Sequence, residues 1–303
     1  MIRRYALEEC RLAVCEDAEG EIILCLDPDD TEKRMLIERY ALDEHTLLSA
    51  LDPNELSRIE TEPSHTALIF KIPKNYDPQD EFEFHVTSLG LFLFEKRLII
   101  VASEDMIPFT GKAFARLERM PEIMLKILNA SISHFRAHLQ VIDRVSEELA
   151  DKISTSMENK YLLRLFALEK SLVYYLNAMA SNGGVLERMK QYAHRLEFHQ
   201  DDRELLEDII IENHQCFKQA KMHSNILSSM MDARVSIVNN NLSILMKRLN
   251  ILTIAIMVPT LVVSTFSMNV AIPLQKNEFA FWIILSLSFI SMAGVLLFWK
   301  FKK

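Results

Sequence analysis

Glycine is scarce in this chain of 303 residues, and its distribution excludes several classes of protein. Only six glycines occur, and only Gly183 and Gly184 are adjacent, so the glycine-rich loop that holds phosphate in many nucleotide-binding proteins is absent. No Ser/His/Asp or Cys/His arrangement has supporting context, so the sequence gives no basis for an enzyme. In a cytosolic body, cysteines stay reduced, so we expect core residues and not a disulfide framework: Cys10, Cys15, Cys25 and Cys216.

Basic residues are in the minority until the last part of the chain. Up to Met246 there are 28 Lys and Arg against 41 Asp and Glu, whereas six basic residues and one acid follow. An acidic body repels phosphate, and no basic stripe offsets it, so we do not expect a nucleic-acid partner. The composition indicates an acidic body joined to a basic and very apolar tail.

Two long runs without charge occupy this tail. Ile251–Met268 has 18 residues and Phe279–Trp299 has 21. The first would span roughly 27 Å as a helix, close to the hydrocarbon thickness of a bilayer, so we predict two membrane spans joined by a short outer loop, 269–278. Basic residues flank the hairpin and no apolar signal segment opens the chain. This predicts a multi-pass protein of the inner (plasma) membrane with both termini in the cytoplasm.

The body divides near Pro121 into two regions of different pattern. Residues 1–120 predict an α/β domain with helices at Thr31–Leu42 and Asp43–Leu51, the second capped by Asp43. The expected strands are rich in Val, Ile and Phe: Glu21–Leu26, Thr66–Ile72, Glu81–Thr87, Leu89–Phe94 and Leu98–Ala102. Residues 121–248 predict a helical stalk, and 249–303 a two-helix transmembrane domain. The expected fold class is therefore an α+β cytosolic domain, a long helical stalk and two C-terminal transmembrane helices.

The stalk has strong helical periodicity and one expected interruption. Apolar residues recur every three, four or seven positions from Leu128 to Ile153. A second helix, from Met157 to Met179, is expected to stop at the Ser181–Gly184 segment. The 74 residues from Val185 to Val258 contain neither Gly nor Pro, which predicts one helix from Asp201 to Met268. Such a helix cannot bury its own apolar face, so it must pack on copies of itself or on the two preceding helices, and we expect an oligomeric stalk.

Polar residues of the first span fall on one side of the predicted helix, and we call this set the polar stripe. Its members are spaced by three or four positions: Ser243, Met246, Leu249, Thr253, Met257, Thr260, Ser264 and Ser267. Two explanations stay open. The hydroxyls bond carbonyls one turn back or allow close helix packing, or the stripe lines a water-filled pore made by several copies, with Met246, Leu249 and Met257 as a narrow constriction. A pore without carboxylates would contact a hydrated cation through dipoles, which suits magnesium because that ion dehydrates reluctantly.

Clusters of other ionisable residues are more typical of solvated surfaces. His134 and His138 are four apart and can hold zinc, but two further ligands are missing, so a surface pair is the more typical interpretation. His194 and His199 are five apart and face differently. A dense acidic group lies at Asp77, Asp80, Glu81 and Glu83.

Several segments closely resemble the CorA family of divalent-cation transporters. The similar segments are YALDEHTLLSALDPNELSRIE (40–60), LFALEKSLVYYLNAM (165–179), LLEDIIIENHQ (205–215), SNILSSMMDARVSIVNNNLSILMKRLNILTI (224–254), Pro259 and Met268-Asn269. This resemblance implies a homopentamer with a funnel-shaped cytosolic body and a pore lined by the first span. It also implies magnesium as the transported ion and as a cytosolic regulator bound by acids between subunits, with no other cofactor and no regulatory residue assigned.

The family signature at the outer pore mouth is Tyr-Gly-Met-Asn, and this chain has Phe266-Ser267-Met268-Asn269. The resemblance implies that the amide oxygens of five Asn269 side chains hold an ion through its hydrating water. Ser267 carries a Cβ where the family has none, which can change how the backbone turns. Ser243 occupies a pore position that is often Asn in the family. In the outer loop, Glu278 either attracts cations or caps the second span, and both interpretations stay open.

Three functions remain as hypotheses. The first is a magnesium channel driven by the membrane potential and closed by cytosolic magnesium. The second is a transporter of another divalent ion such as zinc, cobalt or nickel, which the altered Phe266-Ser267 pair keeps open. The third is an oligomeric membrane sensor or scaffold that does not conduct.

Overall fold

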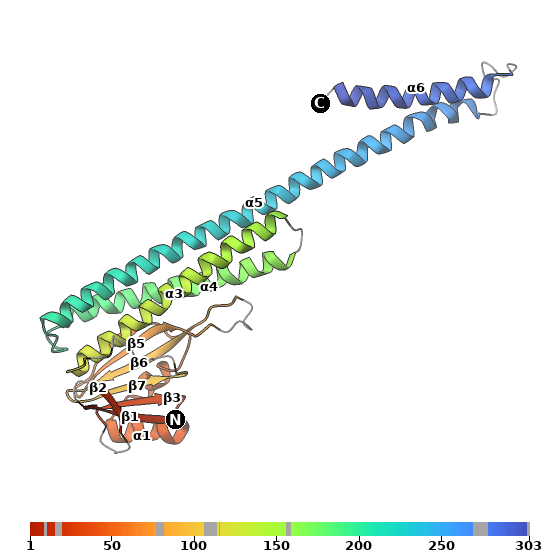
Figure 1. Ribbon diagram of the computed structural model, residues 1–303. Coiled ribbons are helices and arrows are strands. Elements are labelled where there is room, and N and C mark those ends of the chain that lie inside the picture. Colours follow the sequence, from red (N-terminus) through yellow and green to blue (C-terminus); the bar gives the residue numbers. More distant parts are fainter. Residues whose placement is uncertain are drawn as a thin grey trace. The chain divides into compact units, whose positions relative to one another are not determined.

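The computed structural model describes residues 1–8, 11–15, 20–76, 82–105, 114, 116–155, 159–268 and 278–301 (Figure 1). Two compact units are present, Met1–Met231 and Asp232–Lys303. The first contains the sheet and the helices packed on it, and the second contains the C-terminal part of a long helix and the last helix.

The first unit is built on a sheet whose seven described strands have the order β2-β1-β3-β7-β6-β5-β4. The neighbouring strands are antiparallel except β3 and β7, which are parallel. The strands are β1 (Ile2–Glu8), β2 (Arg11–Val14), β3 (Ile22–Leu26), β4 (Arg58–Thr61), β5 (Thr66–Pro73), β6 (Val86–Leu93) and β7 (Leu98–Ala102).

Both faces of the sheet are covered, which explains the almost uniformly apolar central strands. In β3, Ile23 and Cys25 join one buried cluster with residues of α1 (Asp30–Tyr40) and α2 (Glu44–Ser49). Their neighbours Ile22 and Leu24 join the other cluster, with residues of the long helices. The expected role of Cys25 as a core residue is confirmed, and burial raises the pKa of its thiol to about 12.

Three helices follow in the order α3 (Met120–Thr155), α4 (Asn159–Gln191) and α5 (Gln200–Phe266), and α6 (Ala280–Phe301) ends the fold (Figure 1). The periodic apolar residues of α3 are fully or almost fully buried, as predicted: Leu128, Ile132, Phe135, Leu139, Ile142 and Leu149. The predicted helix Asp201–Met268 is confirmed to within two residues at each end. Cysteine 216 lies buried on this helix.

The predicted break at Ser181–Gly184 is wrong, because α4 continues through it to Gln191. Asn182 is fully buried. Its Oδ1 accepts hydrogen bonds from the backbone N–H of Lys71 (2.9 Å) and the hydroxyl of Ser57 (2.7 Å), and its Nδ2 donates to the carbonyl of Lys71 (2.9 Å). β4 pairs with β5 only up to Ile69, so this side chain satisfies backbone groups beyond the end of β4. The bonds of Asn182 therefore hold this part of α4 against the sheet.

One glycine of the pair, Gly183, allows a close approach of α4 to α5. A Cβ on Gly183 would lie 3.2 Å from Nδ2 of Asn213 on α5, whereas a Cβ on Gly184 would meet nothing within 4 Å. Asn213 is buried, and its Nδ2 donates to the carbonyl of Met179 at 2.9 Å. Gly183 thus leaves room for an interhelical hydrogen bond, which a local propensity argument cannot detect.

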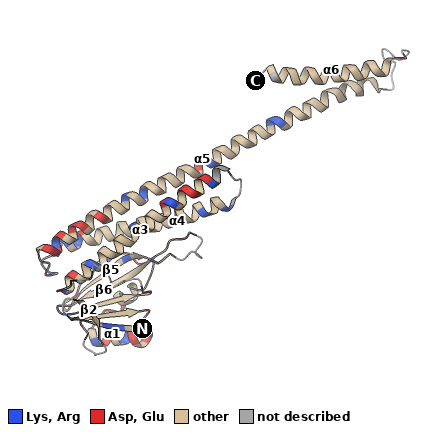
Figure 2. Ribbon diagram, in the orientation of Figure 1, with Lys and Arg blue, Asp and Glu red and all other residues tan. Residues whose placement is uncertain are grey.

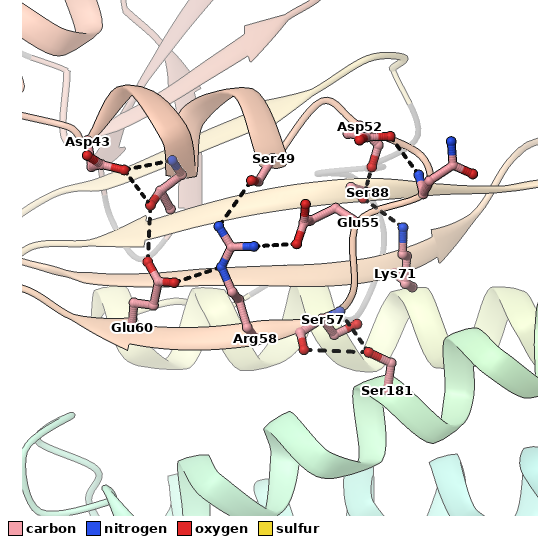
Figure 3. A network of polar contacts seen from close by, with 12 residues as sticks. Asp43, Ser49, Asp52, Glu55, Ser57, Arg58, Glu60, Lys71, Ser88 and Ser181 are labelled. Carbon is pink, nitrogen blue, oxygen red and sulfur yellow. Dashed lines mark hydrogen bonds and ion pairs between the residues drawn. The ribbon is translucent and has the colours of Figure 1, made fainter.

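A polar network surrounds the loop between α2 and β4 (Figure 3). The buried ammonium of Lys71 donates to the carbonyl of Pro53 (2.7 Å) and the hydroxyl of Ser88 (2.9 Å). Burial lowers the pKa of Lys71 to about 8, against the opposing effect of Asp52 and Glu55. In Figure 3, Arg58 reaches Ser49, Glu55 and Glu60. These contacts join α2, the loop that follows it and the sheet.

The predicted strands Glu81–Thr87 and Leu89–Phe94 are in fact parts of one strand, β6, and residues 82–85 are outside it. Phe82 has a φ of 74°, and the backbone N–H of Phe84 donates to the hydroxyl of Ser171 on α4 at 2.8 Å. The aromatic residues that suggested a strand therefore pack on the helices instead.

Candidate pore-lining face of α5

The C-terminal part of α5 and the helix α6 are long and apolar enough to cross a membrane. Of the most apolar 18 consecutive residues in each helix, the chain itself buries 6% in α5 and 0% in α6. The core helices of a soluble domain are instead mostly buried. Charged residues concentrate in the first unit, and on the described part of the second they are few (Figure 2). Both helices therefore expose apolar surface suited to hydrocarbon.

All eight residues of the polar stripe are exposed in the single chain. From Ile251 to Phe266, all but one of the residues that are at least partly covered lie two positions after a member of the stripe: Ile251, Ala255, Pro259, Val262 and Phe266. The exception is Val258, which lies beside Met257. Two positions correspond to about 200° around a helix, so the polar stripe and the covered residues occupy opposite sides of α5. Ala255 is only 8% exposed, and α6 folds back beside the end of α5 (Figure 1). The polar stripe is thus left for surroundings other than its own hairpin.

The hydroxyls of the polar stripe bond to their own helix. Those of Ser243, Thr253 and Thr260 donate to the carbonyls four positions back, at 2.9, 2.9 and 2.7 Å. Ser267 donates to the carbonyl of Ser264 at 2.9 Å. The first of the two explanations from sequence, hydroxyl bonding one turn back, is therefore correct for these four. It does not exclude a pore, because each oxygen keeps lone pairs on an exposed face.

A stricter repeat extends beyond the residues chosen from sequence, and we call it the heptad stripe. Its eleven members are all exposed and alternate in steps of four and three: Asp232, Ser236, Asn239, Ser243, Met246, Asn250, Thr253, Met257, Thr260, Ser264 and Ser267. Asn250 replaces Leu249 in this repeat, because it lies four positions after Met246 and three before Thr253. Asp232 is the one charged member of the heptad stripe. The alternation itself was the signal that could have found both residues. A strict repeat of 3.5 residues is typical of helices that surround a common axis.

The candidate filter segment lies at the end of α5. Phe266 is the last helical residue, and the N–H of Ser267 bonds the carbonyl of Ser264 at 3.2 Å. Ser267 has no positive φ, so its backbone accommodates the Cβ that replaces the family's glycine. Met268 is 58% exposed. Asn269 lies outside the described residues, and its role stays a prediction.

The outer loop contributes one described site residue. Glu278 is exposed and lies two positions before the first residue of α6. Both interpretations of Glu278, cation attraction and helix capping, therefore stay open.

The expected acidic group falls mostly outside the described residues. Asp77, Asp80 and Glu81 are not among them, and Glu83 lies 3.5 Å from both Lys170 and His85. Within the described ranges, no group of three or more His, Cys, Asp or Glu could hold a metal ion. A regulatory magnesium site is therefore left unassigned.

The interpretation of His134 and His138 as a surface pair is wrong. His138 is 7% exposed, and its Nδ1 lies 2.6 Å from the hydroxyl of Tyr175 on α4. Burial lowers the pKa of His138 to about 4, and that of His134 is lowered for the same reason. Phe84 contacts the rings of both His138 and Tyr175. The pair therefore belongs to the packing between α3, α4 and the segment before β6.

The fold and the exposed apolar hairpin together define a membrane protein with a large α+β domain outside the bilayer. The family model described as CorA-like Mg2+ transporter protein matches residues 21–303. The chain belongs to this family, whose members transport divalent cations.

Relatives and solved structures agree with this assignment. The "Cobalt/magnesium transport protein CorA" of Methanocaldococcus jannaschii is 26% identical over 278 residues, which are 87% of this chain and 84% of the relative. A complete structure of the CorA magnesium transporter from that organism has a TM-score of 0.84 at 22% identity and covers 99% of this chain and 97% of its own. The full-length CmaX protein has a TM-score of 0.72 at 14% identity, with 98% and 95% covered. These two structures show the fold.

Proposed function

We propose that this protein is a magnesium channel of the inner membrane, formed by five copies whose α5 helices surround the pore. The heptad stripe carries this proposal, since its hydroxyl residues repeat along one exposed face of the apolar span, at Thr253, Thr260, Ser264 and Ser267. Such a face is costly in lipid and suited to water. The magnesium and cobalt transport named for the archaeal relative supports a divalent ion. The first unit and both termini lie in the cytoplasm in this proposal.

Permeation follows from the chemistry of the stripe. Magnesium keeps its water because its dehydration is unfavourable, and hydroxyl and amide oxygens accept hydrogen bonds from that water. Entry is driven by the inside-negative membrane potential. The thioether side chains of Met246 and Met257 interrupt the polar lining and form constrictions that can lose their water. Asp232 supplies a carboxylate toward the cytoplasmic end, and Asn269 receives the hydrated ion at the outer end. Magnesium bound in the cytoplasm closes the pore.

The first test is ion uptake into proteoliposomes of purified protein that contain a magnesium-sensitive dye. We expect magnesium entry under an inside-negative potential, and loss of entry in Asn269→Ala. Uptake of zinc, cobalt or nickel without magnesium would instead indicate a changed substrate, for which Phe266 and Ser267 are the first candidates. A protein that passes none of these ions contradicts the channel and leaves the non-conducting sensor.

The second test is the accessibility of single cysteines in a variant without the four native ones. Thr260→Cys is expected to react with a water-soluble thiol reagent because it faces the pore. Ala255→Cys is the matched control, since its position is 8% exposed in the single chain and lies on the opposite side of α5. Equal reaction at both positions, or none at position 260 in any gating state, would contradict the assignment of the face.

A further inference from the structure

Three basic residues form a group on the part of α5 that belongs to the first unit. His214, Lys218 and Lys221 are spaced by four and three positions, and all three are exposed. These steps place their side chains within about 60° around the helix and about 11 Å along it. Cys216, two positions from both His214 and Lys218, is buried on the opposite side of the helix. We call the three basic residues the basic band.

Among the described residues, no acid pairs with the basic band. The 19 residues from Asn213 to Met231 contain no Asp or Glu, so no acid lies three or four positions away, where neighbours on a helix surface meet. Glu212, the nearest acid in the sequence, lies 3.4 Å from Arg136 of α3. The ion pairs of the described residues do not include His214, Lys218 or Lys221. The positive charge of the band is therefore not neutralised within the chain.

The acidity of the body as a whole hides this local excess of positive charge. The acids of α5 that belong to the first unit gather at its start: Asp201, Asp202, Glu204, Glu207, Asp208 and Glu212. A count over the whole body averages these acids with the basic band that follows them. The excess becomes apparent only when exposure and ion pairs are considered residue by residue.

The basic band continues the register of the heptad stripe. Counted back from Asp232, the same alternation of three and four passes through four further exposed residues: Ser229, Asn225, Met222 and Lys218. Where five copies of α5 surround a common axis, five Lys218 side chains share one level, with His214 and Lys221 beside them. Ammonium groups at one level repel each other, so this arrangement is stabilised by an anion that lies between them.

We propose that the basic band binds a polyvalent anion whose charge is carried by phosphate groups, and that the copies of the protein share this anion. Ammonium groups donate charge-assisted hydrogen bonds to phosphate oxygens. The exposed amides of Gln215 and Asn225 can donate further hydrogen bonds. An anion with several charges reaches more than one ammonium group at once, which a chloride ion does not. Free polyphosphate and nucleoside triphosphates both present this chemistry. The proposal rests on the five-copy arrangement in the proposed function and is independent of ion flux.

The test is isothermal titration calorimetry of the purified full chain in mild detergent, with pyrophosphate as the probe. EDTA is present so that no metal ion bridges protein and anion. Lys218→Gln and Lys221→Gln each remove one charge per copy, and Lys218→Arg keeps it. Lys96→Gln is the matched control, because Lys96 is exposed in the turn between β6 and β7 and belongs to none of the ion pairs of the described residues. Size-exclusion chromatography checks that each variant assembles.

We expect pyrophosphate to bind with fewer than one anion per chain. Each Gln variant should lower the affinity at least about tenfold, since hydrogen bonds to charged groups are among the stronger ones. The double variant should not bind, whereas Lys218→Arg and Lys96→Gln should stay close to the wild type. A second titration with ATP distinguishes the two sources. Tighter binding of ATP indicates a nucleotide, and equal binding indicates free polyphosphate.

Three results would overturn the proposal: no binding of pyrophosphate to the assembled protein, equal effects of Lys96→Gln and Lys218→Gln, or one anion bound per chain. Light scattering on the same sample separates this failure from that of the proposed function. A protein that does not assemble contradicts the five-copy arrangement itself. An assembly that conducts magnesium but binds no pyrophosphate contradicts only the anion site.

Discussion

His138 and Tyr175 form a hydrogen-bonded pair inside an apolar region, 2.6 Å apart and contacted by Phe84. Because the imidazole is buried, its neutral form is favoured and its pKa falls to about 4. The unfolded chain has an ordinary histidine pKa near 6.5. Between these values the unfolded state binds more protons, so the stabilising contribution is complete above about pH 6.5 and is lost as the pH falls toward 4.

The variant His138→Gln tests this pH dependence. For the wild type we expect the free energy of unfolding to fall by roughly 2 kcal/mol from pH 7 to pH 5 on account of His138. The variant should be less stable at pH 7 and should lose much less on acidification. Circular dichroism during denaturant unfolding measures both values.

The outcome that contradicts this account is a pH dependence equal to that of the wild type. A residual slope is expected from the partly buried His134, whose pKa is also lowered. The double variant His134→Gln, His138→Gln should flatten the profile further.

At the scale of elements, α4 contains two adjacent glycines in different surroundings. Alanine is about 1 kcal/mol more favourable than glycine within a helix. We expect Gly184→Ala to raise the free energy of unfolding by up to about that amount, because its Cβ meets open space. Gly183→Ala should gain less or be destabilising, since its Cβ would press on Asn213 at 3.2 Å. Thermal unfolding of the two variants side by side measures the difference.

Each variant is the control of the other, as both change helix propensity equally. Equal stabilisation would contradict the described contact between α4 and α5. Pairing Gly183→Ala with Asn213→Ala should remove the penalty at position 183, because the contacting amide is then absent.

The sequence predicted the long elements well and the short ones poorly. Periodic apolar residues identified α3, whose burial follows one local repeat. The absence of Gly and Pro identified α5, and an uncharged apolar run identified α6. β4 was missed, because Arg58-Ile59-Glu60-Thr61 is an edge strand of mostly polar residues whose pairing with β5 is not local. β1 was missed for a similar reason, because the charged Arg3 and Arg4 interrupt its apolar residues. Such strands are specified by their neighbours more than by their own composition.

The candidate site was predicted to a similar extent. Spacing alone identified seven of the eleven residues of the heptad stripe in the membrane-spanning region and just before it. Asp232, Ser236 and Asn239 precede the apolar run, so a search confined to the span did not reach them. At Asn250 the preceding Leu249 satisfied the looser spacing. The role of Asn269 comes from family resemblance and not from spacing.

At the scale of the whole molecule, the second unit exposes apolar side chains on several sides of α5. Leu252, Ile256 and Leu261 are each at least 60% exposed in the single chain, as is Met257 of the heptad stripe. Lipid can cover apolar residues, but polar residues of the heptad stripe need water or partner chains. We therefore expect a stable species to contain several copies.

This expectation is checked by light scattering coupled to size-exclusion chromatography in mild detergent. The mass of the protein component should be a multiple of 35.1 kDa, and five copies are proposed. A monodisperse monomer with the helicity of the assembled protein would contradict it.

The heptad stripe also limits how the length of α5 can change during evolution. Removing two residues from its middle would rotate everything beyond the deletion by about 200°, placing hydroxyls against lipid. Removing seven would rotate it by only about 20° and shorten it by about 10 Å. Insertions and deletions within Asp232–Ser267 should therefore survive selection in units of seven, or in pairs that restore the phase. Homologues of different helix length would record this as a periodic gap pattern.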